Sequence, residues 1–126
     1  MGLYNFKPRF VPYIRARTKK HTIRETRKYP DKPGDPMFLY QGLRTKKAKR
    51  ISVEECAKVE SIRIECEYPD AEVILPWDVS VFIEGIELSS PEKESLARAD
   101  GFNDFEEMVR FWDGRLPFEG HIIHWK

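Results

Sequence analysis

The stretch from Ile14 to Arg24 gathers five Lys or Arg residues around Thr22 and His21 within eleven residues. Lys19 and Arg24 stand on either side of Thr22, so we expect its hydroxyl group to lie among fixed positive charges. Such charges bind an anion, or they stabilise the negative charge that develops when a hydroxyl oxygen acts as a nucleophile. The stretch therefore predicts an anion-binding or catalytic site, and the alternative is a solvated basic turn that leads into a strand.

The net charge of +1 hides a strong separation of charge along the chain. Residues 1–50 hold fifteen Lys or Arg and three Asp or Glu, whereas the rest of the chain holds seven and eighteen. This separation is typical of a basic face that binds phosphates, although the two halves can also neutralise each other in the fold. A basic loop over residues 45–50 adds cations, and Tyr40 or Trp77 offers a surface on which a base can stack. The residues expected to contact nucleic acid are Arg17, Lys20, His21, Arg24, Tyr40, Arg44, Lys46 and Lys47.

Length and composition limit the class of protein. A chain of 126 residues, 40% of them apolar, predicts one domain over residues 1–126. No apolar run is long enough to span a membrane, and we expect a monomer in the cytoplasm. Cys56 and Cys66 are expected to be reduced, packed thiols. With three histidines and no CxxC or paired-histidine motif, the sequence predicts no metal site and no cofactor.

The first two thirds of the chain predict a mainly β structure. In the segment 21–27, the alternation places Thr22 and Arg24 on one face and Ile23 on the other. The alternation changes phase near Glu60 and Ser61, which predicts a bulge of the kind that curls small barrels. The predicted strands are Tyr4–Lys7, His21–Arg27, Met37–Arg44, Ile51–Cys66 and Trp77–Ile83.

The last third predicts two helices and a final strand. Ser90 caps the first helix ahead of a proline, and Asp100-Gly101 ends it. Asn103 caps the second helix, which carries one apolar stripe and ends at Asp113-Gly114. The stripe consists of Phe105, Met108, Val109 and Trp112, and the final strand is Gly120–Trp125.

Four short motifs occur in an order that is known from one family. A basic turn ends in Lys19, Thr22, Ile23 and Arg24, and the loop Pro33-Gly34-Asp35 then opens a strand that ends in Tyr40-Gln41-Gly42. Asp100-Gly101-Phe102 leads into a capped helix, and the last strand ends in Trp125. With these motifs, almost the whole chain resembles an ASCH domain. The resemblance implies an α+β fold, namely a PUA-like barrel of mixed and antiparallel strands with short flanking helices.

The resemblance also implies candidate catalytic residues. Members of the family resemble RNA-binding modules, and some are hydrolases; one small member removes the acetyl group from N4-acetylcytidine with a lysine, a threonine and a glutamate. Its basic turn resembles Ile14–Arg24 without gaps, and its lysine and threonine correspond to Lys19 and Thr22. Asp100 stands where that member has the glutamate, and Arg17 replaces a glycine of the turn. The implied catalytic set is therefore Lys19, Thr22 and Asp100.

From these patterns we predict an RNA- or nucleotide-binding domain with a basic cleft built from the first fifty residues. The first alternative is an amidohydrolase for N4-acetylcytidine-type nucleosides, in which neutral Lys19 takes the proton of Thr22. Asp100 then either orients Lys19 or passes a proton to the leaving amine. A ribonuclease is the second alternative, and whether the chain is an enzyme stays open. Burial would lower the pKa of Lys19 and a nearby carboxylate would raise it, and the sequence leaves that balance open.

Overall fold

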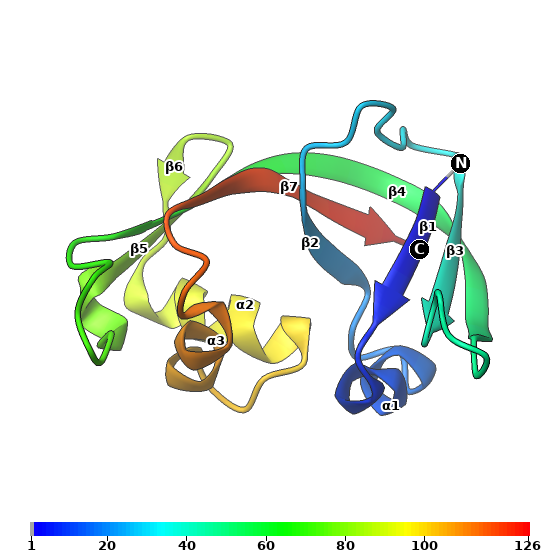
Figure 1. The fold of residues 1–126 in the computed structure, drawn as a ribbon. Helices are drawn as coiled ribbons and strands as arrows, with labels where there is room; N and C mark the ends of the chain where they lie inside the picture. The colour runs from blue at the N-terminus through cyan, green and yellow to red at the C-terminus, as the bar shows by residue number, and fades with distance from the viewer. Residues whose placement is uncertain (1) are drawn as a thin grey trace.

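Residues 2–126, which the computed structural model describes, form seven strands and three helices in a mixed α+β arrangement (Figure 1). The strands are β1 Gly2–Phe6, β2 His21–Glu25, β3 Pro36–Gln41, β4 Lys49–Cys66, β5 Val79–Ile83, β6 Ile86–Glu87 and β7 Phe118–Trp125. The helices are α1 Val11–Arg15, α2 Ser90–Asp100 and α3 Phe105–Trp112, with short 3-10 turns η1 at Pro8–Phe10 and η2 at Pro76–Asp78.

The longest strand, β4, carries most of the sheet. Its first part pairs with β3, its middle with β7 and its last part with β5, all antiparallel. Beyond these partners, β1 pairs with β3 in parallel, β2 pairs with β7, and β6 pairs with β5. The sheet forms an arch, and all three helices lie beneath it (Figure 1). The arch and the helices enclose the space in which the candidate site lies.

The arch is an open sheet, because β1 and β2 share no backbone ladder within residues 2–126. Two arginine side chains connect these strands instead. Arg24 donates to the carbonyl oxygen of Asn5 at 2.6 Å, and Arg27 donates to that of Leu3 at 3.0 Å. Free edge carbonyls of a strand invite pairing with another chain, and the two guanidinium groups occupy them here. The predicted mixed sheet with short helices is therefore confirmed, whereas closure into a barrel is not.

Aromatic side chains pack the space under the arch. In β1, Tyr4 and Phe6 are buried by alternation, and the Phe6 ring meets that of Trp125 edge-on at 6.2 Å. Trp112 of α3 packs on Phe118 of β7, with the ring centres 4.6 Å apart. Each large apolar side chain buried in this way contributes about 1.5–3 kcal/mol to stability. The predicted stripe of α3 is confirmed, because all of its members are buried: Phe105, Met108, Val109 and Trp112.

Helix α2 begins one residue earlier than the sequence pattern predicts. Ser89, rather than Ser90, is the N-cap, and its side chain accepts a hydrogen bond from the amide of Glu92 at 3.3 Å. The carboxylate of Glu92 accepts one from the amide of Ser89 at 2.8 Å. This reciprocal pair needs a glutamate three residues after the cap, a condition that Ser89 meets and Ser90 does not. Ser90 was predicted as the cap because the spacing between Ser89 and Glu92 was not considered.

The cap of helix α3 is also displaced by one residue, but toward the C-terminus. Its N-cap is Asp104, whose carboxylate accepts a hydrogen bond from the amide of Glu107 at 2.8 Å. Asn103, predicted as the cap, instead donates its side-chain amide to Glu107 at 3.1 Å. Aspartate is at least as good a cap as asparagine, and at this position its backbone is extended, as a cap requires. The predicted end of the helix at Asp113 is confirmed.

The bulge in β4 lies earlier than the prediction near Glu60 and Ser61. Its pairing with β7 shifts between Cys56 and Lys58. The apparent change of phase came from counting Val53, Ala57 and Val59 as core residues: Val53 is 47% exposed, and Cys56, Ile62 and Ile64 are the buried residues. A β-branched residue that favours strands for its shape also occupies solvent-facing positions. Apolar residues alone therefore misplaced the bulge.

Several strands are shorter than predicted. Strand β2 ends at Glu25 and β3 at Gln41, and β5 begins at Val79 because the preceding residues form η2. After β3, Gly42 and Arg44 have φ values of 70° and 68°, in the left-handed region that interrupts a strand. The basic loop therefore starts earlier than expected, and its last two residues belong to β4.

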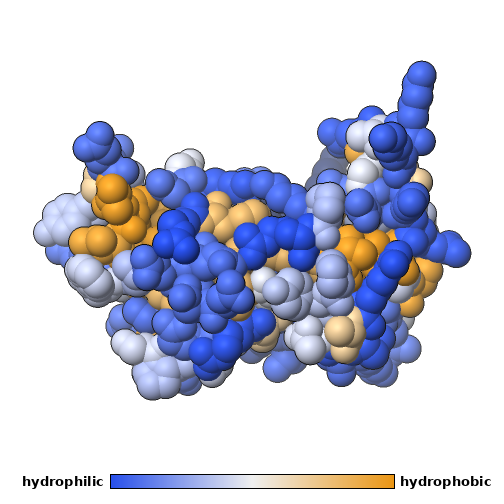
Figure 2. Space-filling view, turned by 90° about the horizontal axis from the view of Figure 1, so that it is seen from below, coloured by the Kyte–Doolittle hydropathy of each residue, from blue (hydrophilic) through white to orange (hydrophobic). Residues whose placement is uncertain are grey.

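The face on the helix side is mainly hydrophilic, with an apolar patch at the end where β5 and β6 lie (Figure 2). Exposed apolar residues of the segment around these strands are Tyr68, Val73, Leu75, Trp77 and Ile86. Trp77, one of the two predicted stacking surfaces, belongs to η2 at this end, away from α1 (Figure 1). Within residues 2–126 we find no helix that is long and apolar enough to cross a membrane.

Replacing Gly120 with alanine is expected to destabilise the protein by about 1–3 kcal/mol. A Cβ at this position would lie 2.1 Å from the carbonyl oxygen of Arg24 and 2.7 Å from the Phe118 ring, so β2 and β7 would have to separate. Urea denaturation measures the loss. Glu119→Ala, at the exposed neighbouring position of β7, is the control, and an unchanged Gly120→Ala midpoint would contradict the close packing of these strands.

Candidate active site

Lys19 and Asp100 form a buried ion pair beneath the arch. The Nζ of Lys19 lies 2.6 Å from Oδ1 of Asp100 and donates to the backbone carbonyl oxygen of Asp100 at 2.8 Å. Lys19 is 3% exposed and Asp100 is 6% exposed. The free energy needed to remove two charges from water is often larger than the free energy gained from their attraction. A pair at this depth is therefore a candidate for function, since stability alone does not account for it.

The turn after α1 places Lys19. The backbone amides of Thr18 and Lys19 both donate to the carbonyl oxygen of Tyr13, which closes the turn. Arg17 has a φ of 62° in this turn, in the left-handed region that glycine adopts most readily. Arginine adopts this conformation at a cost of about 1 kcal/mol.

The end of α2 places Asp100. It is the last residue of the helix, and Gly101 follows with a φ of 103°. A Cβ on Gly101 would lie 3.0 Å from the ring of Phe10 and 3.7 Å from the Lys19 side chain. The glycine that ends the helix therefore also lets α2 approach the turn closely enough for the ion pair to form.

Thr22 is buried, lines the same cavity as this pair and is held by Arg24. Both residues lie on one face of β2, as the alternation predicts, and Thr22 is 4% exposed. The Nε of Arg24 donates to Oγ1 of Thr22 at 2.9 Å. The guanidinium lies over the ring of Phe6 at 5.0 Å from its centre, and burial with the nearby Arg27 lowers the pKa of Arg24 to about 10. Arg24 thus holds the threonine oxygen in place. Its guanidinium stays positively charged at neutral pH.

Burial and pairing act against each other on the pKa values of the ion pair. Burial lowers the pKa of Lys19, and the Asp100 carboxylate offsets this in part, so that the pKa stays below that of an ordinary lysine. Burial raises the pKa of Asp100, but the Lys19 ammonium and the neighbouring His21 outweigh it and leave the pKa lowered. Asp100 is therefore a carboxylate at neutral pH, while Lys19 gives up its proton more readily than an exposed lysine.

These groups line a cavity of about 490 Å³ between the N-terminal segment, β2, the end of α2 and α3. This volume falls in the range of sites that take small organic ligands. Lys19, Thr22 and Asp100 are its buried polar groups, whereas Lys7, Glu25 and Arg115 are exposed and form a rim. Its walls are aromatic and consist of Phe6, Phe10, Phe111, Trp112 and Phe118.

His21 lies behind the ion pair instead of on the cavity lining. Its Nε2 is 3.0 Å from Oδ1 of Asp100, close enough for a charge contact but not aligned as a hydrogen bond. The ring meets that of His124 at 5.6 Å, and Nε2 of His124 lies 2.7 Å from a carboxylate oxygen of Glu60. His21 was predicted to contact nucleic acid. In the structure it is buried and lies beside the Asp100 carboxylate instead.

The predicted residues Lys19, Thr22 and Asp100 line one cavity, and Arg24 lines it as well. Other predicted residues lie outside the cavity lining in the described part of the chain. Exposed Arg17 donates to the carbonyl oxygen of Lys126 and lies 3.5 Å from Glu54. The remaining residues that lie outside the lining are Lys20, Tyr40, Arg44, Lys46 and Lys47, the last three on the exposed loop between β3 and β4. The cleft is thus not built from the first fifty residues alone, because α2 and α3 supply part of its wall.

Sequence reasoning missed Lys7, Phe111 and Arg115. The Nζ of Lys7 lies 5.0 Å from the ring centre of Phe111, and the guanidinium carbon of Arg115 lies 4.7 Å from it. Phe111 lies between Val109 and Trp112 but outside the apolar stripe of α3, so it offered no pattern of its own. Arg115 directly follows the glycine at the end of α3, where a cation is ordinary. Only the fold places these residues at the cavity.

Metal ligation and disulfide bonding receive no support from the side chains of residues 2–126. No group of three His, Cys, Asp or Glu side chains gathers there as metal ligands would. Cys56 and Cys66 are both unbonded, and burial raises the pKa of the Cys56 thiol.

Comparison with known proteins assigns no relative to this chain. A scan against protein-family models, a search of curated proteins and a search of solved structures each returned no match.

Proposed function

We propose that this chain is an amidohydrolase that removes an acyl group from the exocyclic nitrogen of a modified nucleobase, as in N4-acetylcytidine. The observation that carries the proposal is a buried Lys19–Asp100 pair that lines one cavity with a buried threonine hydroxyl. A binding site for a neutral base needs no such pair, whereas acyl transfer needs a nucleophile, a base and a group that holds the base. The resemblance of the basic turn to an ASCH amidohydrolase supports the same assignment.

Thr22 is the proposed nucleophile and Lys19 the proposed base. Neutral Lys19 takes the proton as Oγ1 of Thr22 bonds to the acyl carbon. The ammonium formed in this step is the partner that Asp100 already contacts at 2.6 Å, so the pair stabilises the charged state as it appears. The positive charge of Arg24, fixed on Oγ1 at 2.9 Å, favours the deprotonated oxygen of the nucleophile.

The remaining steps return every group to its starting state. The bond between the acyl carbon and the exocyclic nitrogen breaks, and the nitrogen leaves with its electron pair and the proton from Lys19. Water then attacks the acyl-threonine ester and gives a proton to Lys19, which passes it to the departing oxygen of Thr22. The products are the free nucleobase amine and a carboxylic acid, and Asp100 orients Lys19 throughout.

A turnover assay with N4-acetylcytidine tests the proposal. Mass spectrometry is expected to show cytidine and acetate in equal amounts in the presence of the protein. Nε-acetyl-lysine carries the same amide without a planar ring, so it is the control substrate and should stay intact because it cannot use the aromatic walls. Binding of N4-acetylcytidine without any release of cytidine would overturn the proposal.

The rate of this reaction is expected to rise with pH and to level off at the pKa of Lys19, below the usual range for lysine. The sign follows from the mechanism, since the neutral amine is the reactive form. Asp100→Asn removes the carboxylate that raises this pKa, so the rising limb of the profile should move to lower pH. Single-turnover rates over a pH series measure the rising limb in the wild type and in Asp100→Asn. A limb that moves to higher pH in Asp100→Asn would contradict the role of Lys19.

The second candidate is an RNA- or nucleotide-binding domain that holds a base in this cavity without turnover. The favouring observation is the combination of aromatic walls with Lys7, Arg24 and Arg115, which is the composition of sites for single-stranded bases. In that case binding of a short RNA falls with salt and survives Thr22→Ala. Cleavage of RNA stays a prediction, and no contact among the cavity residues favours it over the removal of an acyl group.

A further inference from the structure

We infer that the ligand of this cavity carries a phosphate on its ribose, and that Lys7 and Arg115 at the rim bind that phosphate. The inference rests on the proposed function and narrows its substrate class from a nucleoside to a nucleotide. The shared chemistry is a ribose phosphate, which a free nucleoside 5′-monophosphate or a nucleotide within an RNA strand can supply.

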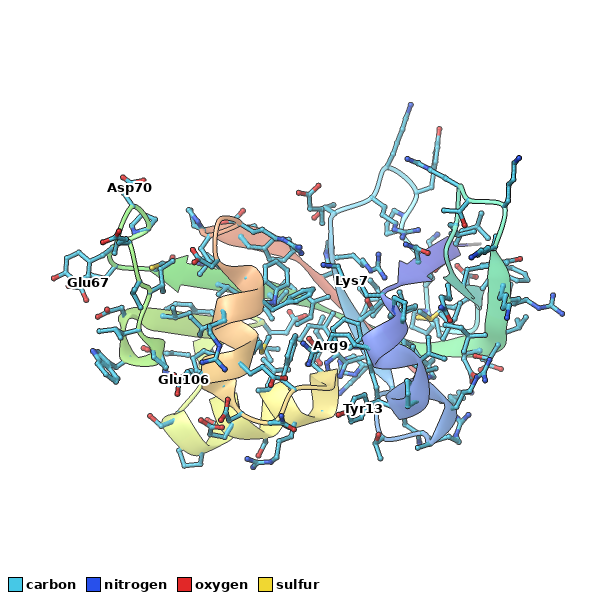
Figure 3. All side chains as sticks on the ribbon, turned by 60° about the horizontal axis from the view of Figure 1, so that its bottom comes forward. Lys7, Arg9, Tyr13, Glu67, Asp70 and Glu106 are labelled. Carbon is cyan, nitrogen blue, oxygen red and sulfur yellow. The ribbon has the colours of Figure 1, made fainter. Side chains whose placement is uncertain are left out.

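The two cations flank one aromatic ring at the cavity. Lys7 directly follows β1, and Arg115 lies three residues after the end of α3, so two segments that line the cavity contribute one cation each. Their charged groups lie 5.0 Å and 4.7 Å from the centre of the Phe111 ring. Figure 3 shows Lys7 at the gap between the N-terminal segment and α3. A ligand that enters past Phe111 therefore meets both cations.

Charge pairing distinguishes Lys7 and Arg115 from Lys19 and Arg9, whereas the Arg24 guanidinium is held by hydrogen bonds to Thr22 and Asn5. Asp100 neutralises Lys19 at 2.6 Å, and Glu107 neutralises Arg9 at 2.6 Å. In residues 2–126, the side chains of Lys7 and Arg115 form no ion pair and lie over aromatic rings. A ring face holds a cation in place without cancelling its charge. Both cations therefore remain available to an anion.

The depths at which these residues lie in the cavity indicate how the ligand is oriented. The reacting groups Lys19, Thr22 and Asp100 are buried, whereas Lys7 and Arg115 are exposed. A nucleotide bound with its acylated base at the buried end therefore presents its ribose and phosphate at the rim. The exposed carboxylate of Glu25 also lies on this rim and repels a phosphate, but two cations outnumber it. Glu25 thus provides an independent test of the sign of the ligand's charge.

Binding to the Thr22→Ala protein, which lacks the proposed nucleophile, tests the inference without turnover. Calorimetry is used to compare N4-acetylcytidine, its 5′-monophosphate and a trinucleotide with N4-acetylcytidine in the middle. The monophosphate should bind about 10- to 100-fold more tightly than the nucleoside, as one or two charge-assisted hydrogen bonds provide. Tighter binding of the trinucleotide than of the monophosphate would identify an RNA strand as the source of the phosphate.

Substitutions at the rim test which residues cause the tighter binding of the monophosphate. Lys7→Gln and Arg115→Gln should each reduce the preference for the monophosphate, and together they should abolish it while affinity for the nucleoside stays within about twofold. Glu25→Gln should strengthen binding of the monophosphate. Lys28→Gln is the matched control, because Lys28 is also exposed over an aromatic ring, Tyr29, at 5.6 Å but lies outside the cavity lining.

Each outcome separates this inference from the proposed function. Equal affinity for nucleoside and monophosphate would overturn the phosphate site and leave the proposed function standing. A preference for the monophosphate that survives the double substitution would also overturn it. If none of the three ligands binds, both proposals fail.

Discussion

Replacing Lys19 with methionine is expected to destabilise the protein by about 3–5 kcal/mol, the loss typical of a broken buried ion pair. Methionine fills nearly the same space, so packing changes little. The loss arises because the Asp100 carboxylate stays 6% exposed without the ammonium at 2.6 Å that compensates for its burial. Asp100 thus changes from a satisfied group to an uncompensated charge, with His21 as its remaining ionisable contact.

A double substitution separates this cause from a packing defect. Lys19→Met with Asp100→Leu removes both charges, and replacement of a buried pair by apolar residues is often neutral or stabilising. Urea denaturation should therefore place the double variant within about 1 kcal/mol of the wild type or above it. Lys28→Met, at an exposed lysine, is the control. A single Lys19→Met variant as stable as the wild type would show that the pair is not a buried ion pair.

The pH dependence of this loss has a defined sign. The pKa of Asp100 is lowered in the folded protein, so its contribution to stability is present above the unfolded value of about 3.9 and is lost as the pH falls through the folded value. In Lys19→Met the lowering influence of the ammonium is gone. The stability difference between the wild type and this variant should therefore shrink when the solution is acidified below pH 4 or so, because a protonated carboxyl needs no counter-charge.

Removal of the Thr22 hydroxyl is expected to lower the rate of acyl release by about 10³-fold or more, because a missing nucleophile leaves only the residual catalysis of its surroundings. The stability cost should be much smaller, about 0.5–1.5 kcal/mol, since one hydrogen bond from Arg24 at 2.9 Å is lost. Thr22→Ser keeps the hydroxyl and should retain a rate far above that of Thr22→Ala. Single-turnover release of cytidine and thermal unfolding measure the two effects.

Thr18→Ala provides the matched control for this loss. Thr18 belongs to the same basic turn, but it is exposed, and its hydroxyl donates to the carbonyl oxygen of Tyr13 at 3.2 Å instead of lining the cavity. Its rate should stay near that of the wild type. Rates for Thr22→Ala that match the control would rule out threonine as the nucleophile, even where the wild type releases cytidine.

Local patterns account for the parts of the fold that were predicted well. The stripe of α3 and the glycine stop of α2 depend on residues within one or two helical turns of each other. The errors of one residue at Ser89 and Asp104 have the same local origin, since two adjacent polar residues compete for one cap. The extra phase change in β4 came in part from exposed Val53, whose environment depends on the sheet and not on its neighbours in sequence.

In the candidate site, too, residues that are close in sequence could be predicted from local patterns, and distant ones could not. Lys19, Thr22 and Arg24 were predicted because they lie within six consecutive residues, in β2 and the turn before it. Asp100 could be placed beside them only through the resemblance to a family, because 81 residues separate it from Lys19. The predicted nucleic-acid contacts at Arg44, Lys46 and Lys47 followed from charge alone, and charge gives no direction in space.

The sequence by itself determined the α+β character, the basic turn and the position of a threonine between two cations, because each of these depends on neighbouring residues. The tertiary structure decided that Lys19 meets Asp100, that Lys7 and Arg115 flank Phe111, and that Arg24 and Arg27 bridge β1 and β2 in place of a ladder. These contacts join distant segments. They form only because burial of the aromatic side chains brings β1, α2 and α3 together under the arch, and no local pattern encodes that packing.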